Sequence, residues 1–169
     1  MKPDHFRDII ATNALYRPGP LEGGMVDDYV QVKHGRKQAA YIHPVMKEVL
    51  EETHGVMVYQ EQVMQTAVTM AGFSMGEADT LRKAMGKKKI DVMAKMKEQF
   101  LDGAEARGHD RKKAQALWDY IEPFAGYGFN KSHSTGYAIV AYQTAYLKTY
   151  FPAQYMAAFL SYESQAQKA

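Results

Sequence analysis

The 169-residue sequence contains no cysteine, which excludes disulfides, thiolate metal sites and cysteine nucleophiles. Its six histidines are scattered, and no two of them have the i, i+4 spacing of a metal-binding pair on a helix. The first ten residues lack the apolar run of a signal peptide and carry Lys2, Asp4, Arg7 and Asp8. We therefore expect a cytoplasmic protein with no membrane partner.

Groups of side chains suited to covalent or metal chemistry are also missing. Ser132 and His133 are adjacent in sequence, so their side chains rarely face each other for proton transfer, and no acid is placed to orient the imidazole. Asp27 and Asp28 are neighbours too, and neighbouring side chains on a helix point in different directions. The sequence therefore predicts no catalytic residue and no metal site in this segment.

Charge is distributed unevenly along the chain. The net charge is +2, yet residues 81–113 contain eleven Lys or Arg and five acids, a local charge of 11 − 5 = +6. The remainder therefore carries 2 − 6 = −4. A basic block on a mildly acidic domain points to contact with a polyanion, either nucleic acid or phosphate groups. A solvated helix face is the other interpretation of such a block.

Apolar residues recur with the 3.6-residue period of helices in several segments, for example over residues 60–71. Ser74 and Glu77 have the spacing of a capping box, and Asp110 is placed to cap a later helix. The chain length fits one domain. The sequence predicts an all-α fold, a single compact domain of about seven to nine helices. At most a short β stretch is expected at residues 56–59, Val-Met-Val-Tyr.

The segment from residue 124 to residue 152 contains a polar cluster followed by a long, nearly uncharged helix. The cluster, residues 130–133, is expected to be a loop, with Ser134 or Thr135 as the cap of the helix. That helix, roughly residues 136–150, is apolar or small on every side, which is typical of a buried central helix. A donor-rich loop fixed to the end of a core helix is suited to binding a ligand.

A last helix is expected to begin at Pro152, because proline favours the first helical position. Its expected buried face consists of Tyr155, Met156, Phe159 and Leu160. Residues 164–169 are expected to form a frayed tail.

Donors suited to phosphate oxygens lie in several separate segments. Arginine presents a planar fork and lysine a point charge, and both bind phosphate. The donors are Arg17, Arg82, Lys83, Lys87, Lys88, Lys89 and the cluster Asn130, Lys131, Ser132 and His133. Nearby aromatic rings could stack on a base, but core packing is the favoured interpretation for Phe129 and Tyr137. The residues predict a helical module that grips a nucleotide or a nucleic acid.

Four longer motifs carry a resemblance to a known family. They are residues 14–20 (ALYRPGP), 58–64 (VYQEQVM), 84–89 (AMGKKK) and 124–134 (FAGYGFNKSHS). In this order, from about residue 2 to residue 161, the sequence resembles the fingers domain of the alpha subunit of bacterial DNA polymerase III, a C-family DNA polymerase. The resemblance implies a fingers domain over residues 1–163, with residues 1–20 as a candidate junction to the palm.

In that family the fingers close over the incoming deoxynucleoside triphosphate, while aspartates of the palm, outside this segment, hold Mg²⁺. The resemblance implies nucleotide binding by Arg82, Lys83, Asn130, Lys131, Ser132 and His133. It implies contact with phosphate or DNA at Arg17, Lys87, Lys88 and Lys89. Expected partners are the deoxynucleoside triphosphate, primer–template DNA, the other domains of the alpha subunit and, through them, further replisome subunits. The segment alone is expected to be inactive.

Two positions depart from the family pattern. Lys83 stands where relatives usually have a second arginine, and Pro123 stands where a charged residue is common. The alternative function is a stand-alone helical nucleic-acid-binding or interaction module derived from the fingers domain. The parent enzyme could be the main replicase or an error-prone paralogue. In either case the resemblance implies a bacterial cytoplasmic protein associated with the nucleoid.

Overall fold

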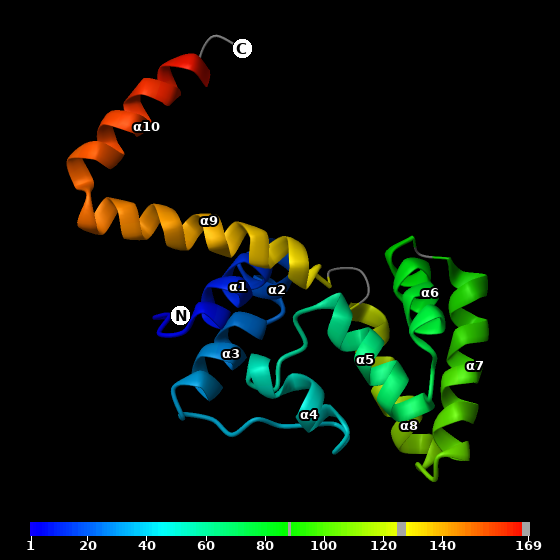
Figure 1. Ribbon diagram of the computed structural model, residues 1–169. Coiled ribbons are helices and arrows are strands. Elements are labelled where there is room, and N and C mark those ends of the chain that lie inside the picture. The colour runs from blue at the N-terminus through cyan, green and yellow to red at the C-terminus, as the bar shows by residue number, and fades with distance from the viewer. Residues whose placement is uncertain (88, 125–127, 167–169) are drawn as a thin grey trace.

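The computed structural model describes residues 1–87, 89–124 and 128–166 of the chain (Figure 1). In these ranges it contains ten α-helices and one 3-10 helix, so the all-α prediction is confirmed. They are α1 (Phe6–Leu15), α2 (Pro18–Glu22), α3 (Met25–Lys33), α4 (Met46–Leu50), η1 (Glu51–Thr53), α5 (Gln60–Ala71), α6 (Met75–Gly86), α7 (Ile90–Ala106), α8 (Arg111–Phe124), α9 (Lys131–Tyr150) and α10 (Pro152–Ala166). Because α2 and α4 have only five residues each, 10 − 2 = 8 longer helices remain, within the predicted range. None of the described helices combines the length and the apolar character of a membrane span.

Two of the predicted caps are present. The Ser74 hydroxyl accepts a hydrogen bond from the Glu77 amide (3.2 Å), and the Glu77 carboxylate accepts one from the Ser74 amide (2.8 Å). The Asp110 carboxylate likewise accepts a hydrogen bond from the Lys113 amide (3.0 Å) at the start of α8. These caps satisfy amides that have no partner inside the helix, so α6 and α8 begin where the sequence indicates.

The β-prone stretch at residues 56–59 forms no strand in the part of the chain that the structure describes. Tyr59 makes an isolated parallel bridge to Phe129. The Phe129 amide donates to the Val58 carbonyl (3.2 Å), and the Gln60 amide donates to the Phe129 carbonyl (2.9 Å). This bridge attaches the segment before α9 to the start of α5.

Helices α5, α6, α7 and α8 enclose the main core (Figure 1). Large side chains at its centre are Met70, Leu81, Phe100, Leu117, Trp118 and Ile121, each fully or almost fully buried. A smaller core lies between α1 and α3 and includes Leu15, Tyr29 and Tyr59. Burial of a large apolar side chain contributes roughly 1.5–3 kcal/mol, so these clusters account for much of the stability of the fold.

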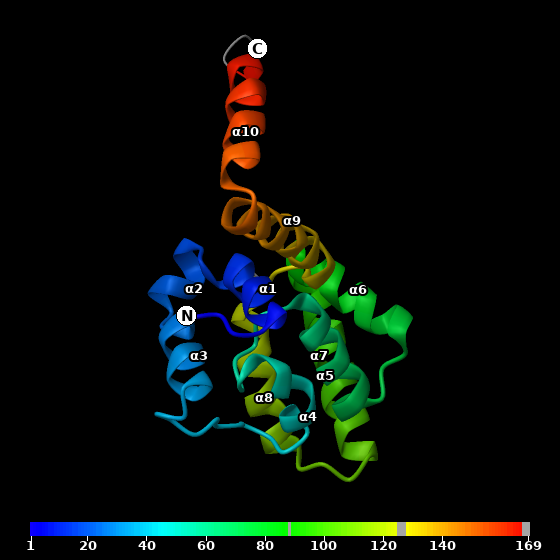
Figure 2. The ribbon, with the colours of Figure 1, turned by 60° about the vertical axis from the view of Figure 1, so that its left-hand side comes forward.

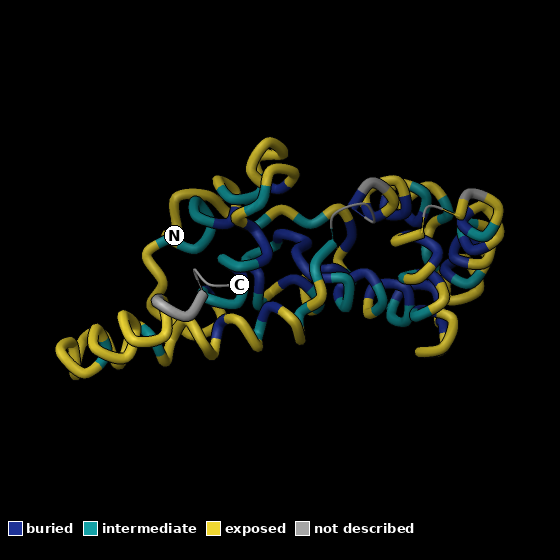
Figure 3. The backbone as a smooth tube through the Cα atoms, turned by 90° about the horizontal axis from the view of Figure 1, so that it is seen from above, coloured by how far each residue is buried: buried dark blue, intermediate teal, exposed yellow. Residues whose placement is uncertain are grey.

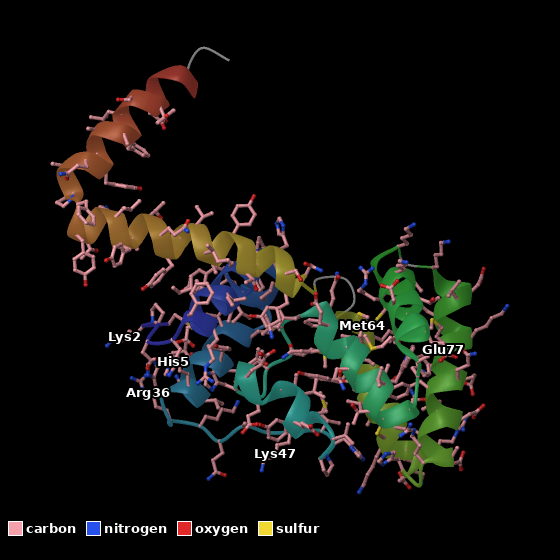
Figure 4. All side chains as sticks on the ribbon, in the orientation of Figure 1. Lys2, His5, Arg36, Lys47, Met64 and Glu77 are labelled. Atoms are coloured by element: carbon pink, nitrogen blue, oxygen red, sulfur yellow. The ribbon has the colours of Figure 1, made fainter. Side chains whose placement is uncertain are left out.

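Helices α9 and α10 differ most from the sequence prediction. Of the α9 side chains only Ser134 and Ala138 are buried. Most residues of the two helices are exposed (Figure 3), and many of their side chains project away from the other helices (Figure 4). Their exposed apolar side chains are Tyr137, Ile139, Val140, Tyr142, Tyr146, Leu147, Tyr150, Met156, Phe159, Leu160 and Tyr162. Helix α9 packs along α1, and α10 extends away from the other helices (Figure 2). The predicted burial of the central helix and of the α10 face is therefore wrong, because no other described helix covers these surfaces.

Gly103 allows α7 to approach the C-terminal end of α5. A Cβ atom at this position would overlap the backbone carbonyl oxygen of Ala71. We expect Gly103→Ala to lower the free energy of unfolding by about 1–2 kcal/mol, because the overlap outweighs the gain in helix propensity. Gly136→Ala in α9 is the control, since a Cβ there meets open space. That change should stabilise by roughly 0.5–1 kcal/mol. Thermal unfolding followed by circular dichroism measures both, and a stabilising Gly103→Ala would contradict the packing.

Candidate functional site

The predicted cluster at residues 130–133 forms the start of α9 and not a loop. Asn130 is the N-cap of this helix, and its side-chain oxygen accepts a hydrogen bond from the His133 amide (2.8 Å). The capping role predicted for Ser134 or Thr135 therefore belongs to Asn130. The Thr135 hydroxyl donates to the Lys131 carbonyl (2.8 Å) instead. The cluster thus projects from a helix N-terminus, where backbone amides and the helix dipole favour negative charge.

Two glutamates contact one side of this helix start. The Glu61 carboxylate accepts hydrogen bonds from the Lys131 amide (3.0 and 3.2 Å) and from the Asn130 side chain (3.1 Å). The Lys131 ammonium donates to both carboxylate oxygens of Glu52, each at 2.7 Å. The charged residues lining the surrounding groove of about 470 Å³ are Glu48, Glu51, Glu52, Glu61 and Lys131. An anion that reaches Lys131 from this groove must displace Glu52.

The other side of the helix start is aromatic. The His133 ring lies 4.9 Å from the Tyr137 ring and 5.6 Å from the Phe129 ring, measured between centroids. The Arg17 guanidinium carbon lies 4.5 Å from the Phe129 centroid, within the range of a cation–π contact. Ser132 and His133 line a shallow pocket of about 340 Å³ together with Tyr137. Tyr137 is 62% exposed, so core packing is wrong for it, whereas Phe129 packs against the smaller core.

Arg82 and Lys83 share one carboxylate, that of Asp79. One oxygen of Asp79 accepts hydrogen bonds from Nε (2.9 Å) and from a terminal nitrogen (2.8 Å) of Arg82. The other oxygen lies 2.7 Å from the Lys83 ammonium. These two cations hold the pKa of Asp79 below its usual value by hydrogen bonding and by their charge. The carboxylate therefore stays ionised at neutral pH.

Gln60, the first residue of α5, connects Arg82 to the segment that leads into α9. Its side-chain oxygen lies 3.5 Å from the remaining terminal nitrogen of Arg82, a long hydrogen bond. Its side-chain amide donates to the Gly128 carbonyl (3.0 Å). The start of α5 therefore contacts both groups of predicted donors, because the next residue, Glu61, contacts Asn130 and Lys131.

The remaining predicted contacts lie between α6 and α7. Lys87 and Lys89 are exposed in the turn between these helices, and Lys88 lies outside the described residues. No salt bridge to another described residue involves Lys87 or Lys89. Lys87 and Lys89 follow Arg82 and Lys83 in the sequence and add positive charge at the end of α6. The side chain of Pro123 is also outside the described residues, although α8 ends directly after it, at Phe124.

Three side chains near the N-terminus are close enough together to bind a metal ion: among the described residues this group is Asp4, His5 and Asp8. The Lys33 ammonium donates to Asp4 and also to Asp8 (2.7 Å). A positive charge therefore already lies between these carboxylates, and the group does not fit a divalent cation as well. No metal site is inferred from it.

Comparison with known proteins agrees with the motifs. The family model described as the bacterial DNA polymerase III alpha subunit finger domain matches residues 1–108. DNA polymerase III subunit alpha of Campylobacter jejuni is 57% identical over 163 residues, which cover 96% of this chain and 14% of that protein. The proteins of the same description from Helicobacter pylori and Aquifex aeolicus are 56% and 52% identical, over 97% and 99% of this chain and 14% of each relative. This chain belongs to the finger domain family.

The finger domain described here therefore spans about a seventh of the length of these curated relatives. Its match to them continues through α8 and α9, beyond the 108 residues of the family model. The contacts at Asp79, Glu52 and Gln60 were missed from sequence. The spacing of Asp79 from Arg82 and Lys83, i, i+3 and i, i+4, is a signal that could have found the first of them. Glu52 lies 79 residues from Lys131, and no local pattern indicates that pairing.

Proposed function

We propose that this finger domain binds the triphosphate of the incoming deoxynucleoside triphosphate and closes over the nascent base pair during DNA replication. The observation that supports this most directly is the position of Arg82. Its side chain, on α6, contacts Gln60 at the start of α5, and the neighbouring Glu61 contacts Asn130 and Lys131 at the start of α9. Cationic and amide donors from distant parts of the sequence therefore meet around one helix N-terminus, an arrangement suited to phosphate.

In this proposal different residues bind different parts of the nucleotide. Arg82 and Lys83 bind phosphate oxygens through charge-assisted hydrogen bonds. Ser132 and His133, beside the exposed ring of Tyr137, bind the nucleotide from the aromatic side of α9. Lys131 and Asn130 complete the site once a phosphate replaces the contact of Lys131 to Glu52 and that of the Asn130 side chain to Glu61. Arg17, Lys87, Lys88 and Lys89 contact phosphate groups of the nucleotide or of the DNA.

In this proposal the metal ions are bound by parts of the polymerase outside this domain. Phosphoryl transfer by polymerases depends on divalent ions that bridge the reacting phosphates, and carboxylates hold such ions. Within residues 1–87, 89–124 and 128–166, the one candidate group already contains the Lys33 ammonium. We therefore assign Mg²⁺ to carboxylates of the remaining polymerase, and the finger domain supplies cations and closure.

The partners follow from this assignment. The finger domain contacts the nucleotide, primer–template DNA and the other domains of the alpha subunit, and through them it belongs to a replisome in the bacterial cytoplasm, at the nucleoid. A stand-alone nucleic-acid-binding module is the second candidate. The +6 charge of residues 81–113 is compatible with both.

Titrations of the purified 169-residue chain separate the two candidates. We expect no primer extension with magnesium, because in the part of the chain that the structure describes the one candidate group for a metal already contains the Lys33 ammonium. Affinity for DNA should be weak, and log affinity should fall against log salt with a slope of roughly −3 to −4.5 if about three to five phosphates are contacted. Affinity for a deoxynucleoside triphosphate should be about millimolar if each contact adds only ~1 kcal/mol.

Far-UV circular dichroism dominated by helix is the control that the chain is folded in these titrations. Metal-dependent primer extension by the chain alone would contradict the proposal directly. Sequence-specific DNA binding that does not weaken with salt would favour the stand-alone module, because neutralised phosphates necessarily make affinity salt-dependent.

A further inference from the structure

The guanidinium of Arg82 is held from two sides. A guanidinium has five N–H groups in a fixed planar fork. Asp79 accepts from Nε and one terminal nitrogen, at 2.9 and 2.8 Å. Gln60 accepts from the other terminal nitrogen at 3.5 Å. Two N–H groups remain, one on each terminal nitrogen, and no described residue accepts a hydrogen bond from them.

Because Asp79 binds the edge formed by Nε and one terminal nitrogen, the end-on fork, with one N–H from each terminal nitrogen, is contacted among the described residues at most by the 3.5 Å hydrogen bond to Gln60. Two parallel N–H groups of this kind match two oxygens of a phosphate, and bidentate binding adds geometric specificity to the charge. Asp79 uses the side edge of Arg82 and leaves the end-on fork uncovered. The carboxylate therefore orients the guanidinium without competing for the donors that suit a phosphate.

Lys83 differs from Arg82 in this respect. Its side chain is 62% exposed, and its ammonium lies 2.7 Å from the second oxygen of Asp79. A lysine has a point charge and cannot present a bidentate fork. Of this pair, Arg82 is therefore the residue that Asp79 orients while leaving its end-on fork without contact from Asp79 itself.

Gln60 connects Arg82 to the segment before α9 through hydrogen bonds to both. Its side-chain amide donates to the Gly128 carbonyl at 3.0 Å, and its own backbone amide donates to the Phe129 carbonyl at 2.9 Å. A displacement of residues 128–129 therefore moves an acceptor of Arg82. The guanidinium is oriented by α6 through Asp79 and by the segment before α9 through Gln60.

We propose that Asp79 and Gln60 are positioning residues that aim the end-on fork of Arg82 at the triphosphate. This inference rests on the proposed binding of the nucleotide by Arg82, and it adds two residues that act through Arg82 and touch no substrate. Loss of either residue leaves the charge of Arg82 in place but removes its orientation. The effect therefore falls on nucleotide binding and not on DNA binding.

A double-mutant cycle in a full-length DNA polymerase III alpha subunit that carries this segment tests the inference. Single-nucleotide incorporation is measured on saturating primer–template. Asp79→Ala and Gln60→Ala are each expected to raise the KM for the nucleotide, on the order of 10-fold for Asp79→Ala and severalfold for Gln60→Ala, with less change in kcat. In an Arg82→Ala background, Asp79→Ala should change KM less than about 2-fold, because residues that act through one group are not additive.

Two further variants sharpen the cycle. Asp79→Asn retains one carbonyl oxygen as an acceptor, so its KM should rise only about 3-fold, since a neutral acceptor is roughly half as strong. Asp102→Ala is the matched control, because Asp102 also pairs with an arginine, Arg111 (2.7 Å), but joins α7 to α8. It should leave KM unchanged.

Each outcome has one meaning. Equal effects of Asp79→Ala in the two backgrounds, or no effect of either Asp79→Ala or Gln60→Ala, would overturn the positioning roles while nucleotide binding by Arg82 still stood. An unchanged KM in Arg82→Ala itself would instead overturn the proposed function of Arg82. Thermal unfolding of every variant shows whether it is folded. If Asp79→Ala fails to fold, the KM values of Gln60→Ala and Asp79→Asn decide the inference.

Discussion

Replacing Arg82 by alanine in a full-length alpha subunit is expected to lower the efficiency of nucleotide incorporation by roughly 10- to 150-fold. A hydrogen bond to a charged group is worth ~1.5–3 kcal/mol, and this free energy converts directly to the ratio of kcat/KM values. The Arg82 side chain is partly exposed, and its guanidinium keeps two N–H groups that no described residue uses. Its removal should therefore weaken triphosphate binding and leave primer–template affinity nearly unchanged.

Steady-state kinetics and a DNA-binding titration measure these two quantities in one preparation. Arg111→Ala is the matched control, because Arg111 is also held by carboxylates, Asp102 (2.7 Å), Glu98 (3.0 Å) and Glu105 (3.1 Å), on α7. That variant should incorporate nucleotide normally. If Arg82→Ala incorporates normally but loses DNA affinity, Arg82 contacts the duplex and the nucleotide assignment is wrong.

Replacing Lys33 by methionine is expected to lower the free energy of unfolding by about 3 kcal/mol, because the change leaves a buried carboxylate without its cation. The Asp8 side chain is 1% exposed and the Lys33 side chain 5% exposed, with 2.7 Å between ammonium and carboxylate. Asp8 also accepts hydrogen bonds from the amides of Asp4 and His5, each at 3.1 Å, and joins the start of α1 to the end of α3. Urea unfolding followed by circular dichroism measures the loss.

Lys37→Met is the control for this substitution. The Lys37 ammonium lies 2.6 Å from Asp28, but both side chains are 53% exposed. Solvent screens such a pair, so the expected cost is below about 1 kcal/mol. Equal losses in the two variants would contradict the inference that burial gives the Asp8–Lys33 pair its importance.

The same pair gives the stability a dependence on pH. Burial raises the pKa of Asp8, but the Lys33 ammonium and the backbone amides of Asp4 and His5 outweigh burial and hold the pKa below its usual value. The unfolded chain then binds the proton more readily, since an ordinary Asp has a pKa of about 3.9. The contribution is therefore complete above about pH 5 and is lost as the pH falls below about 4. The difference in the free energy of unfolding between the original chain and Lys33→Met should therefore become smaller as the pH is lowered from about 5 to below about 4.

Much of the fold follows from the sequence by itself. Helices form where apolar residues recur at the helical period, and Ser74, Glu77 and Asp110 cap them through contacts within three residues. These terms are local, so a sequence pattern contains them. The same applies to Arg82 and Asp79, which are one helical turn apart.

The tertiary structure decided which contacts the donors of the candidate site make. Lys131 lies against Glu52, 79 residues away, and Gln60 reaches Gly128 across 68 residues. The sequence indicated that Asn130 to His133 were donors but placed them in a loop, because a helix start and a polar loop have similar composition. Only the side-chain contact to the His133 amide shows that Asn130 is the cap.

Helix α9 shows most clearly which properties the sequence determines and which the tertiary packing determines. Its sequence determined that nearly every side is apolar or small, and this pattern predicted burial. In the structure one side contacts α1, while Tyr137, Val140 and Leu147 remain exposed. An apolar surface is a property of the helix alone, whereas burial requires a second surface at the right place, and that is supplied by tertiary packing over long distances in sequence.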